Sequence, residues 1–193
     1  MPSEIALLTQ KRPEELDDLA LLRAAAAGDE ASATVFFKRF HDPVIGFLSR
    51  MLGRDDPELD DLVQATFLSA LDSAGRFEGR SQVRTWVLGI AANKARTHRR
   101  GAGRRRTALA AVPEETSKIP SPSDGVKREQ LRERLAAAVD GLSAREREAF
   151  LLCDVEGVGG NVAAETLGVP QGTMWRRLHD ARNKLKQALA GER

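Results

Sequence analysis

The sequence has little of the residue types that build disulfides and metal centres. It contains one Cys and three His among 193 residues, and it has no Tyr. A single Cys excludes a disulfide within the chain, and one Cys with three scattered His cannot supply the four ligands of a structural zinc site. We therefore expect no disulfide framework, no bound metal and no cofactor.

Long apolar runs are also missing. No stretch approaches the roughly 18 apolar residues that a membrane-spanning helix needs. The first 18 residues lack the basic region followed by an apolar segment that is typical of a secretory signal. These absences predict a cytoplasmic protein that does not insert into a membrane.

The net charge of +2 hides a strong separation of charge along the chain. Residues 1–75 hold 7 basic and 14 acidic side chains, whereas residues 76–106 hold 10 basic side chains and a single acidic one. A concentrated basic block is typical of a surface that binds a polyanion. The alternative is a solvated, arginine-rich helix end that runs into a disordered segment.

Helical spacing governs the hydrophobic pattern, and no segment alternates long enough to predict a strand. The clearest break covers residues 101–125, where three Pro, three Gly and clustered Ser and Thr replace the apolar periodicity. We predict an all-α protein of two small helical domains joined by a flexible linker. Its parts are a poorly ordered leader (1–18), a first domain (19–100), a linker (101–128) and a second domain (129–193).

An acidic segment follows Gly53 in the first domain, after an expected helix break at Asp42-Pro43. Asp56 is expected to cap a helix, with Pro57 in its first turn. On this helix one face carries three residues at the spacing i, i+3 and i+7, apart from the apolar stripe: Asp61, Gln64 and Leu68. Either Asp60 and Asp61 are solvated helix charges, or this face docks on a basic partner helix.

The basic block contains a second helix, for which Ser81 is the expected cap. Its apolar stripe consists of Val83, Trp86, Val87, Ile90 and Ala91. The polar and basic positions outside that stripe are Arg80, Arg84, Asn93, Lys94, Arg96, His98, Arg99 and Arg100. Such a face suits contact with nucleic-acid phosphates, and the alternative is that the distal arginines only complement the helix dipole.

The second domain has the punctuation of a helix-turn-helix. Ser143 and Glu146 form a capping-box pattern for a helix to about Val155, a short helix covers residues 161–167, and a long helix begins at Thr173. The outward positions near the start of the long helix, where base edges would lie, are Trp175, Arg176, His179 and Asp180, with Arg177 and Arg182 nearer the phosphates. A plain helical hairpin is the alternative.

Taken together, these segments resemble the extracytoplasmic-function (ECF, group IV) sigma factors of the sigma-70 family, and three blocks carry the resemblance. The D-x-x-D-L-V-Q-x-T-F pattern is matched by Asp61, Leu62, Val63, Gln64, Thr66 and Phe67. The F-x-G-x-S-x-x-R-T-W-x-x-x-I-A-x-N pattern is matched by Phe77, Gly79, Ser81, Arg84, Thr85, Trp86, Ile90, Ala91 and Asn93. The third block runs from Leu142 through Arg182.

The resemblance implies a promoter-specificity subunit that binds RNA polymerase core and promoter DNA and catalyses no reaction. Docking on the clamp helices of the largest polymerase subunit would fall to Asp60, Asp61, Leu62, Val63, Gln64, Phe67 and Leu68. Capture of the unpaired minus-10 strand would fall to Phe77, Gly79, Arg80, Ser81, Arg84, Thr85, Trp86, Asn93, Lys94 and Arg96. Reading of the minus-35 duplex would fall to Thr173, Trp175, Arg176, Arg177, His179, Asp180 and Arg182. The resemblance also implies an anti-sigma factor as a partner.

The chain departs from the family pattern at several positions, so no promoter sequence is transferred to it. These positions are Val83, Leu88-Gly89, residues 158–164, Trp175, Arg176 and Asp180. The main alternative function is a free-standing helix-turn-helix regulator that binds duplex DNA without polymerase. A protein-only adaptor is a further alternative. An enzyme has the least support, because no nucleophile and base pairing or phosphate loop is evident.

Overall fold

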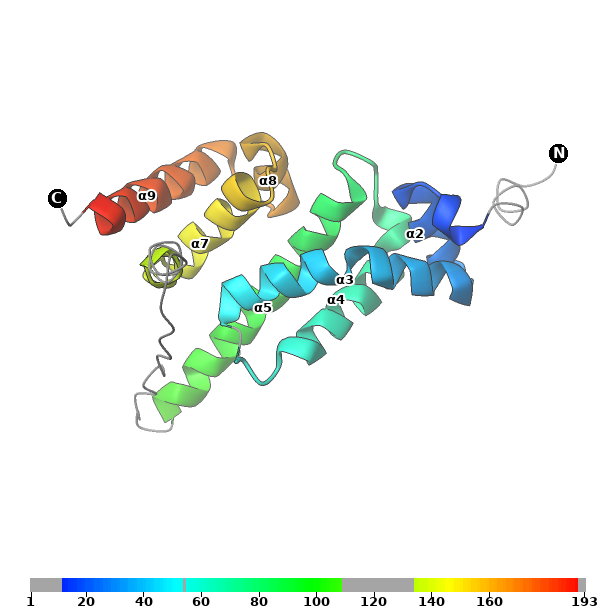
Figure 1. Cartoon of the computed structure of the whole chain (residues 1–193), viewed down its shortest axis with the longest axis horizontal. Coiled ribbons are helices and arrows are strands. Elements are labelled where there is room, and N and C mark those ends of the chain that lie inside the picture. Colours follow the sequence, from blue (N-terminus) through cyan, green and yellow to red (C-terminus); the bar gives the residue numbers. More distant parts are fainter. Residues whose placement is uncertain (1–11, 54, 109–133, 191–193) are drawn as a thin grey trace, which may run out of the picture.

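The computed structural model of the chain describes residues 12–53, 55–108 and 134–190 (Figure 1). Its elements are η1 (Pro13–Glu15), α2 (Asp18–Ala26), α3 (Glu30–Leu52), α4 (Leu59–Ser73), η2 (Ala74–Arg76), α5 (Val83–Ala108), α7 (Ala144–Phe150), η3 (Leu151–Val155), α8 (Gly160–Thr166) and α9 (Gln171–Ala190). Residues 134–140 are also helical, and no strand occurs within the described residues. The predicted all-α fold is confirmed. Of the expected linker over residues 101–128, residues 109–128 lie outside the described residues.

The N-terminal half is a bundle in which α3 packs on α2, α4 and α5. Asp17 and Asp29 start α2 and α3, because their carboxylates accept hydrogen bonds from the backbone of Ala20 at 2.8 Å and Ser32 at 2.9 Å. The bundle core is apolar and fully buried at Phe36, Phe47, Leu48, Met51 and Leu88. This core holds α4 and α5 in fixed positions side by side.

Ordered structure extends past two predicted boundaries of the first domain. Residues 12–18 belong to the fold, because Arg39 donates hydrogen bonds to the carbonyls of Leu16 and Glu14 and to the carboxylate of Asp18. At the other end, α5 continues to Ala108, so residues 101–108 are helical although the sequence placed them in the linker.

One predicted helix break and two predicted helix caps are not formed in the structure. Asp42-Pro43 does not break α3, because the buried positions on both sides of Pro43 hold the helix together. Asp56 does not cap α4; its carboxylate accepts from the backbone of Glu58 in the turn before the helix, at 3.0 Å. Ser81 donates to the carbonyl of Gln82 and leaves the first turn of α5 uncapped by its side chain.

The C-terminal half follows the predicted helix-turn-helix. Ser143 and Glu146 form the capping box of α7, and the π-helical turn η3 carries the chain on to Val155, where the first helix was expected to end. The turn between α8 and α9 passes through Gly168 with φ of 62°, a left-handed conformation that favours Gly. The long helix α9 starts at Gln171, two residues before the predicted start.

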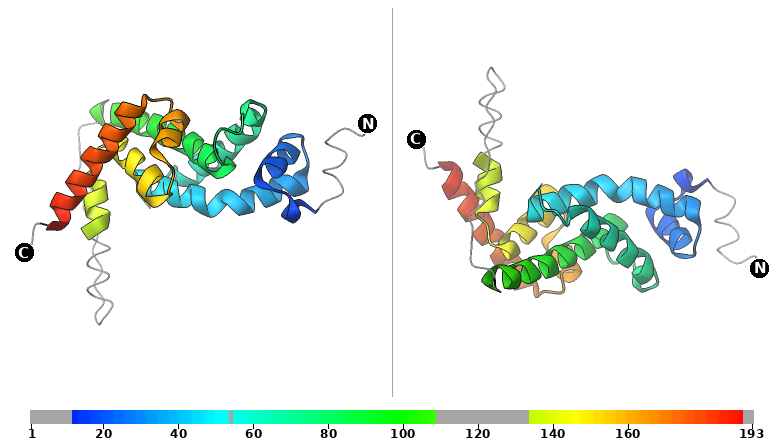
Figure 2. Two further views of the ribbon diagram at one scale, coloured as in Figure 1. Left: turned by 90° about the horizontal axis from the view of Figure 1, so that it is seen from above. Right: turned by 90° about the horizontal axis from the view of Figure 1, so that it is seen from below.

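The two halves share a core, although the sequence predicted separate modules on a tether. Buried residues of the bundle and of α7, η3, α8 and α9 form one contiguous apolar cluster. A smaller cluster of Leu142, Ala181 and Leu185 completes the C-terminal half. The C-terminal half lies along one side of α5, with α8 beside the start of α5 and α7 beside the end of α3 (Figures 1 and 2). Among the described helices, none combines the length and apolar character needed to cross a membrane.

Candidate polymerase and nucleic-acid interfaces

The outer face of α4 carries the three residues that the sequence grouped together. Asp61, Gln64 and Leu68 are all exposed, and Leu68 leaves 56% of its surface in contact with solvent. Val63 and Phe67, which were also expected at the polymerase contact, are buried. Their side chains fix α4 on the bundle, because the apolar stripe of an amphipathic helix faces its own core.

An exposed aromatic ring, which the sequence analysis did not predict, extends this face. Phe37 on α3 is 44% exposed, and its ring centroid lies 4.8 Å from that of Phe67 on α4. His41 lies on the other side of Phe37, at a ring separation of 5.0 Å. The exposed face of α4 therefore continues onto α3 through the apolar ring of Phe37, with acidic side chains nearby.

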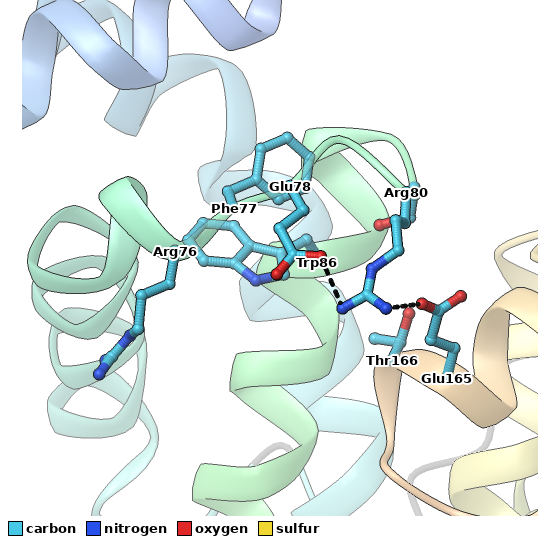
Figure 3. Close-up of a pocket in the computed structure, with 8 residues that line it drawn as sticks. Arg76, Phe77, Glu78, Arg80, Trp86, Glu165 and Thr166 are labelled. Carbon is cyan, nitrogen blue, oxygen red and sulfur yellow. Dashed lines mark ion pairs between the residues drawn. The ribbon is translucent and has the colours of Figure 1, made fainter.

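The segment before α5 forms a small pocket of ≈ 210 Å³ (Figure 3). The rings of Phe77 and Trp86 form one wall, with centroids 5.0 Å apart and planes tilted by 46°. Gly79 turns the segment with φ of 72°. An aromatic wall with nearby arginines suits an unpaired base and its phosphate.

Arg80 closes this pocket on one side. Its guanidinium pairs with Glu78 at 3.0 Å and with Glu165 of α8 at 2.9 Å, as Figure 3 shows. Arg80 and Glu165 are both exposed, so water screens this pair. A side chain that the sequence assigned to DNA is thus linked to the C-terminal half.

Arg84 makes a second link of the same kind. It is paired with Glu156, whose carboxylate also accepts from Arg50 of α3 at 2.6 Å. The Glu156 side chain is only 4% exposed. Two arginines from the N-terminal half therefore enclose one carboxylate from the C-terminal half.

Arg96 makes the third link, to a carboxylate buried at the junction of α5 and α7. Its Nη2 lies 2.6 Å from Oε1 of Glu148, which is 1% exposed. Oε2 of Glu148 accepts no hydrogen bond, and the Nη1 of Arg177 lies 3.9 Å from it. Burial raises the pKa of the Glu148 carboxyl above its ordinary range, against the hydrogen bond from Arg96, which lowers it.

Some predicted phosphate-facing residues of α5 point inward. Thr85 is buried. His98 lies between two carboxylates, with Nε2 3.0 Å from Asp56 and Nδ1 2.9 Å from Glu58. Arg99 donates to the carbonyl of Met51 at 3.1 Å. His98 and Arg99 thus connect α5 to its neighbours, whereas Asn93 and Arg100 are exposed and Lys94 is half-buried.

The first turns of α9 present the predicted recognition residues unevenly. Trp175, Arg176 and His179 are exposed, and Thr173 and Asp180 are half-buried. Arg182 is held by Asp154 through two hydrogen bonds, of 2.9 and 2.6 Å. Arg177 lies near Glu148, with its Nη1 3.9 Å from Oε2 of that residue. The indole and Arg176 thus form the outermost surface of the recognition helix.

Besides Phe37, the sequence analysis missed four ion-pairing residues at these sites: Arg50, Glu148, Glu156 and Glu165. The partners in these ion pairs lie between 52 and 106 residues apart along the chain: Arg96 with Glu148, Arg84 and Arg50 with Glu156, and Arg80 with Glu165. No local pattern marks such pairs.

Each half of the chain matches a known protein family. Residues 36–105 match the family described as Sigma-70 region 2, and residues 132–185 match Sigma-70, region 4. The chain is 35% identical over 153 residues to the RNA polymerase sigma factor CarQ of Myxococcus xanthus, covering 79% of this chain and 86% of CarQ. It is also 35% identical over 167 residues to the ECF RNA polymerase sigma factor SigC of Mycobacterium tuberculosis, covering 86% and 88%.

Solved structures with a similar fold are also known. The sigma factor RpoE of Bartonella quintana, solved in complex with the anti-sigma factor NepR, is 27% identical, with a TM-score of 0.66 over 83% of this chain and 98% of RpoE. CnrH, solved in complex with the cytosolic domain of CnrY, shares the fold at 24% identity and a TM-score of 0.62, covering 91% of this chain and 99% of CnrH. The chain belongs to the ECF sigma factors of the sigma-70 family and directs promoter-specific initiation of transcription.

Proposed function

We propose that three surfaces of this sigma factor divide the work of initiation. The exposed face of α4 docks on the polymerase core, the pocket and outer face of α5 hold the unpaired minus-10 strand, and the start of α9 reads the minus-35 duplex. The observation that carries this assignment is the separation of the three surfaces onto different elements of the fold. Two weak DNA sites and one protein site then act together through their high effective concentration.

Docking on the core falls to the face around Leu68. An exposed Leu flanked by Asp61 and Gln64 offers an apolar contact within an acidic surround, which fits a basic helical partner. Asp60 and Leu62 lie at the edge of this face. Phe37 extends the apolar contact onto α3.

Capture of the minus-10 strand falls to the pocket walled by Phe77 and Trp86. An unpaired base stacks on an aromatic ring, and Arg80 supplies positive charge at the pocket. Arg84 and Arg96 carry positive charge farther along α5. Gly79 and Ser81 shape the loop, and Asn93 and Lys94 continue the polar face of α5.

Reading of the minus-35 duplex falls to the exposed start of α9. Arg176 suits a guanine edge in the major groove, and Trp175 offers an apolar surface to a thymine methyl. Thr173, His179, Asp180 and Arg182 lie within the following turns. Arg177 supports this surface from inside through Glu148.

We further assign a cytoplasmic location and a mechanism of binding alone, with no covalent step. An anti-sigma factor is the expected regulatory partner, supported by the similarity to RpoE, which was solved bound to one. The free-standing regulator is the competing function, and it would not need α4.

The test is binding of purified core polymerase to the full chain, measured by co-migration on a sizing column. Asp61→Arg should abolish co-migration, because it places a positive charge on the docking face. Glu14→Arg is the matched control, since Glu14 is exposed on η1. Its hydrogen bond with Arg39 is made by the backbone carbonyl and not by the side chain that is replaced. Equal co-migration of Asp61→Arg and Glu14→Arg would overturn the docking assignment.

A further inference from the structure

His98 joins the second half of α5 to the turn that precedes α4. Its Nε2 lies 3.0 Å from Oδ2 of Asp56, and its Nδ1 lies 2.9 Å from Oε2 of Glu58. The imidazole side chain is only 8% exposed, so water contributes little to these contacts. One side chain therefore holds two acidic residues directly before the helix that is proposed to dock on the polymerase core.

The two contacts of His98 require the charged form of the ring. A carboxylate only accepts hydrogen bonds, and a neutral imidazole has one nitrogen that donates and one that accepts. Both contacts can be hydrogen bonds only when each ring nitrogen carries a proton. Loss of one proton leaves a ring nitrogen with its lone pair directed at a carboxylate oxygen, so one of the two contacts becomes repulsive.

Asp56 carries this effect to the backbone at the start of α4. Its other oxygen, Oδ1, accepts from the backbone N–H of Glu58 at 3.0 Å, and its carbonyl accepts from Leu59 at 3.1 Å. The carbonyl of Glu58 then accepts from the N–H of Leu62 at 2.9 Å, which begins the helical bonding. The N-cap side chain of α4 makes no capping bond, so these interactions set where the helix begins. His98 thus orients the first turn of α4 through the Asp56 carboxylate.

The segment that His98 contacts is densely acidic. Five of the seven residues from position 55 to position 61 carry a carboxylate: Asp55, Asp56, Glu58, Asp60 and Asp61. Like charges at such short spacing repel one another, and an imidazolium between two of them offsets part of that repulsion. Asp61 lies less than one helical turn beyond Glu58, on the exposed face of α4. A change of charge at His98 is therefore felt next to the docking face.

The other charged groups around His98 come from three elements. Lys94 lies one turn earlier on α5, and Arg99 follows His98 and donates to the carbonyl of Met51 at the end of α3. Arg147 of α7 donates to the same carbonyl. Arginine keeps its charge throughout the physiological range, whereas histidine is the side chain whose charge ordinarily changes there.

We propose that His98 is a positioning residue for polymerase docking, whose imidazolium form holds the start of α4 in the orientation that binds the core. The inference rests on the proposed function, because it takes the exposed face of α4 as the docking surface. His98 is buried, so it acts through Asp56 and Glu58 and not by contact with the polymerase. Docking is then stronger below neutral pH and weakens as the pH rises and His98 loses its charge.

The first experiment removes the charge of His98. A fluorescently labelled full chain is titrated with purified core polymerase at about pH 6 and about pH 8, at equal ionic strength. The ratio of the dissociation constant of His98→Gln to that of wild type cancels the titration of groups on the polymerase. This ratio should be about ten at the lower pH and should fall to within about twofold of one at the higher pH.

The neighbouring position on α5 offers a matched control. Thr97→Gln places the same side chain at an exposed site of the same helix. Its dissociation constant should stay within about twofold of the wild-type value at both pH values. Helicity by circular dichroism confirms that the variants fold.

The second experiment changes the partner of His98. In Asp56→Asn the amide oxygen can still accept from the backbone of Glu58, and the amide nitrogen can donate to the bare Nε2 of a neutral imidazole. This variant should therefore lose affinity for the core at about pH 6 and recover it at about pH 8, so that its dissociation constant relative to wild type falls at least about fivefold. A merely structural role for His98 predicts no such recovery.

Asp61→Arg, measured in the same titration, separates the inference from the function on which it rests. If Asp61→Arg binds the core as well as wild type, the docking assignment fails and the inference fails with it. If Asp61→Arg loses binding but the His98→Gln ratio is equal at both pH values, only the role of His98 is overturned. Should His98→Gln not fold, Asp56→Asn decides alone: recovery of affinity at the higher pH supports the inference, and a constant ratio to wild type overturns it.

Discussion

Trp175 on α9 lies directly over Gly160 on α8. A Cβ at Gly160 would meet Cζ2 of the indole at 2.7 Å and Cη2 at 2.8 Å. The indole is nevertheless 48% exposed, so one face rests on the backbone of α8 and the other is open. These two residues are both departures from the family pattern, and the structure shows that each accommodates the other.

We predict that Gly160→Ala changes minus-35 preference without a change in minus-10 preference. The added methyl group must displace the indole, which alters the surface that α9 presents to the major groove. The measurement is selection of minus-35 duplexes from a randomised pool by the holoenzyme. Gly159→Ala is the control, because a Cβ there meets nothing within 4 Å. If the minus-35 preference of Gly160→Ala is unchanged, Trp175 does not contribute to reading of the minus-35 duplex.

Arg147 is predicted to be a stability residue and not a DNA contact. Its guanidinium is 3% exposed and donates to the carbonyls of Val139, Asp140 and Met51. Arg147→Met should lower the free energy of unfolding by about 3 kcal/mol, because these carbonyls lose a charged donor. Denaturant unfolding measures this change. Arg145→Met, at an exposed position of the same helix, should stay within about 0.5 kcal/mol of wild type.

Glu146 is predicted to make stability depend on pH in the acid range. The hydrogen bond from Lys184 holds the pKa of Glu146 below its ordinary value of 4.5. A carboxyl with a lowered pKa stabilises the fold above its ordinary pKa, and this contribution is lost as pH falls below 4.5 through the lowered value.

The variant Glu146→Gln tests this pH dependence. It keeps an acceptor for the backbone N–H of Ser143 but has no charge for Lys184. Its free energy of unfolding should therefore fall less steeply than that of wild type between about pH 6 and about pH 3.5. Parallel curves for the two proteins would contradict the assigned role.

Local sequence signals predicted the C-terminal half well and the ends of the N-terminal half less well. The capping box at Ser143 works because both of its bonds lie within one turn. Pro43 misleads because the loss of one backbone hydrogen bond is offset by burial of Phe40, Val44 and Phe47 around it. Packing decides such a position, and packing is not a local property.

The relation between the two halves could not be predicted from the sequence. The exposed face of α4 and the start of α9 follow from helical periodicity, so those site residues could be proposed early. The pairing of Glu156 with Arg84 joins positions 72 residues apart. The missing side chain at Gly89 affects packing only because Thr166 lies against that position. Neither relation leaves a periodic pattern.

Run-off transcription with bacterial core polymerase and a library of genomic upstream fragments tests the central claim most directly. Wild type should give discrete starts, and a folded Asp61→Arg protein should give none, because it does not dock on the core. Starts that persist with Asp61→Arg, or an absence of starts with wild type alongside duplex binding without core, would contradict the account.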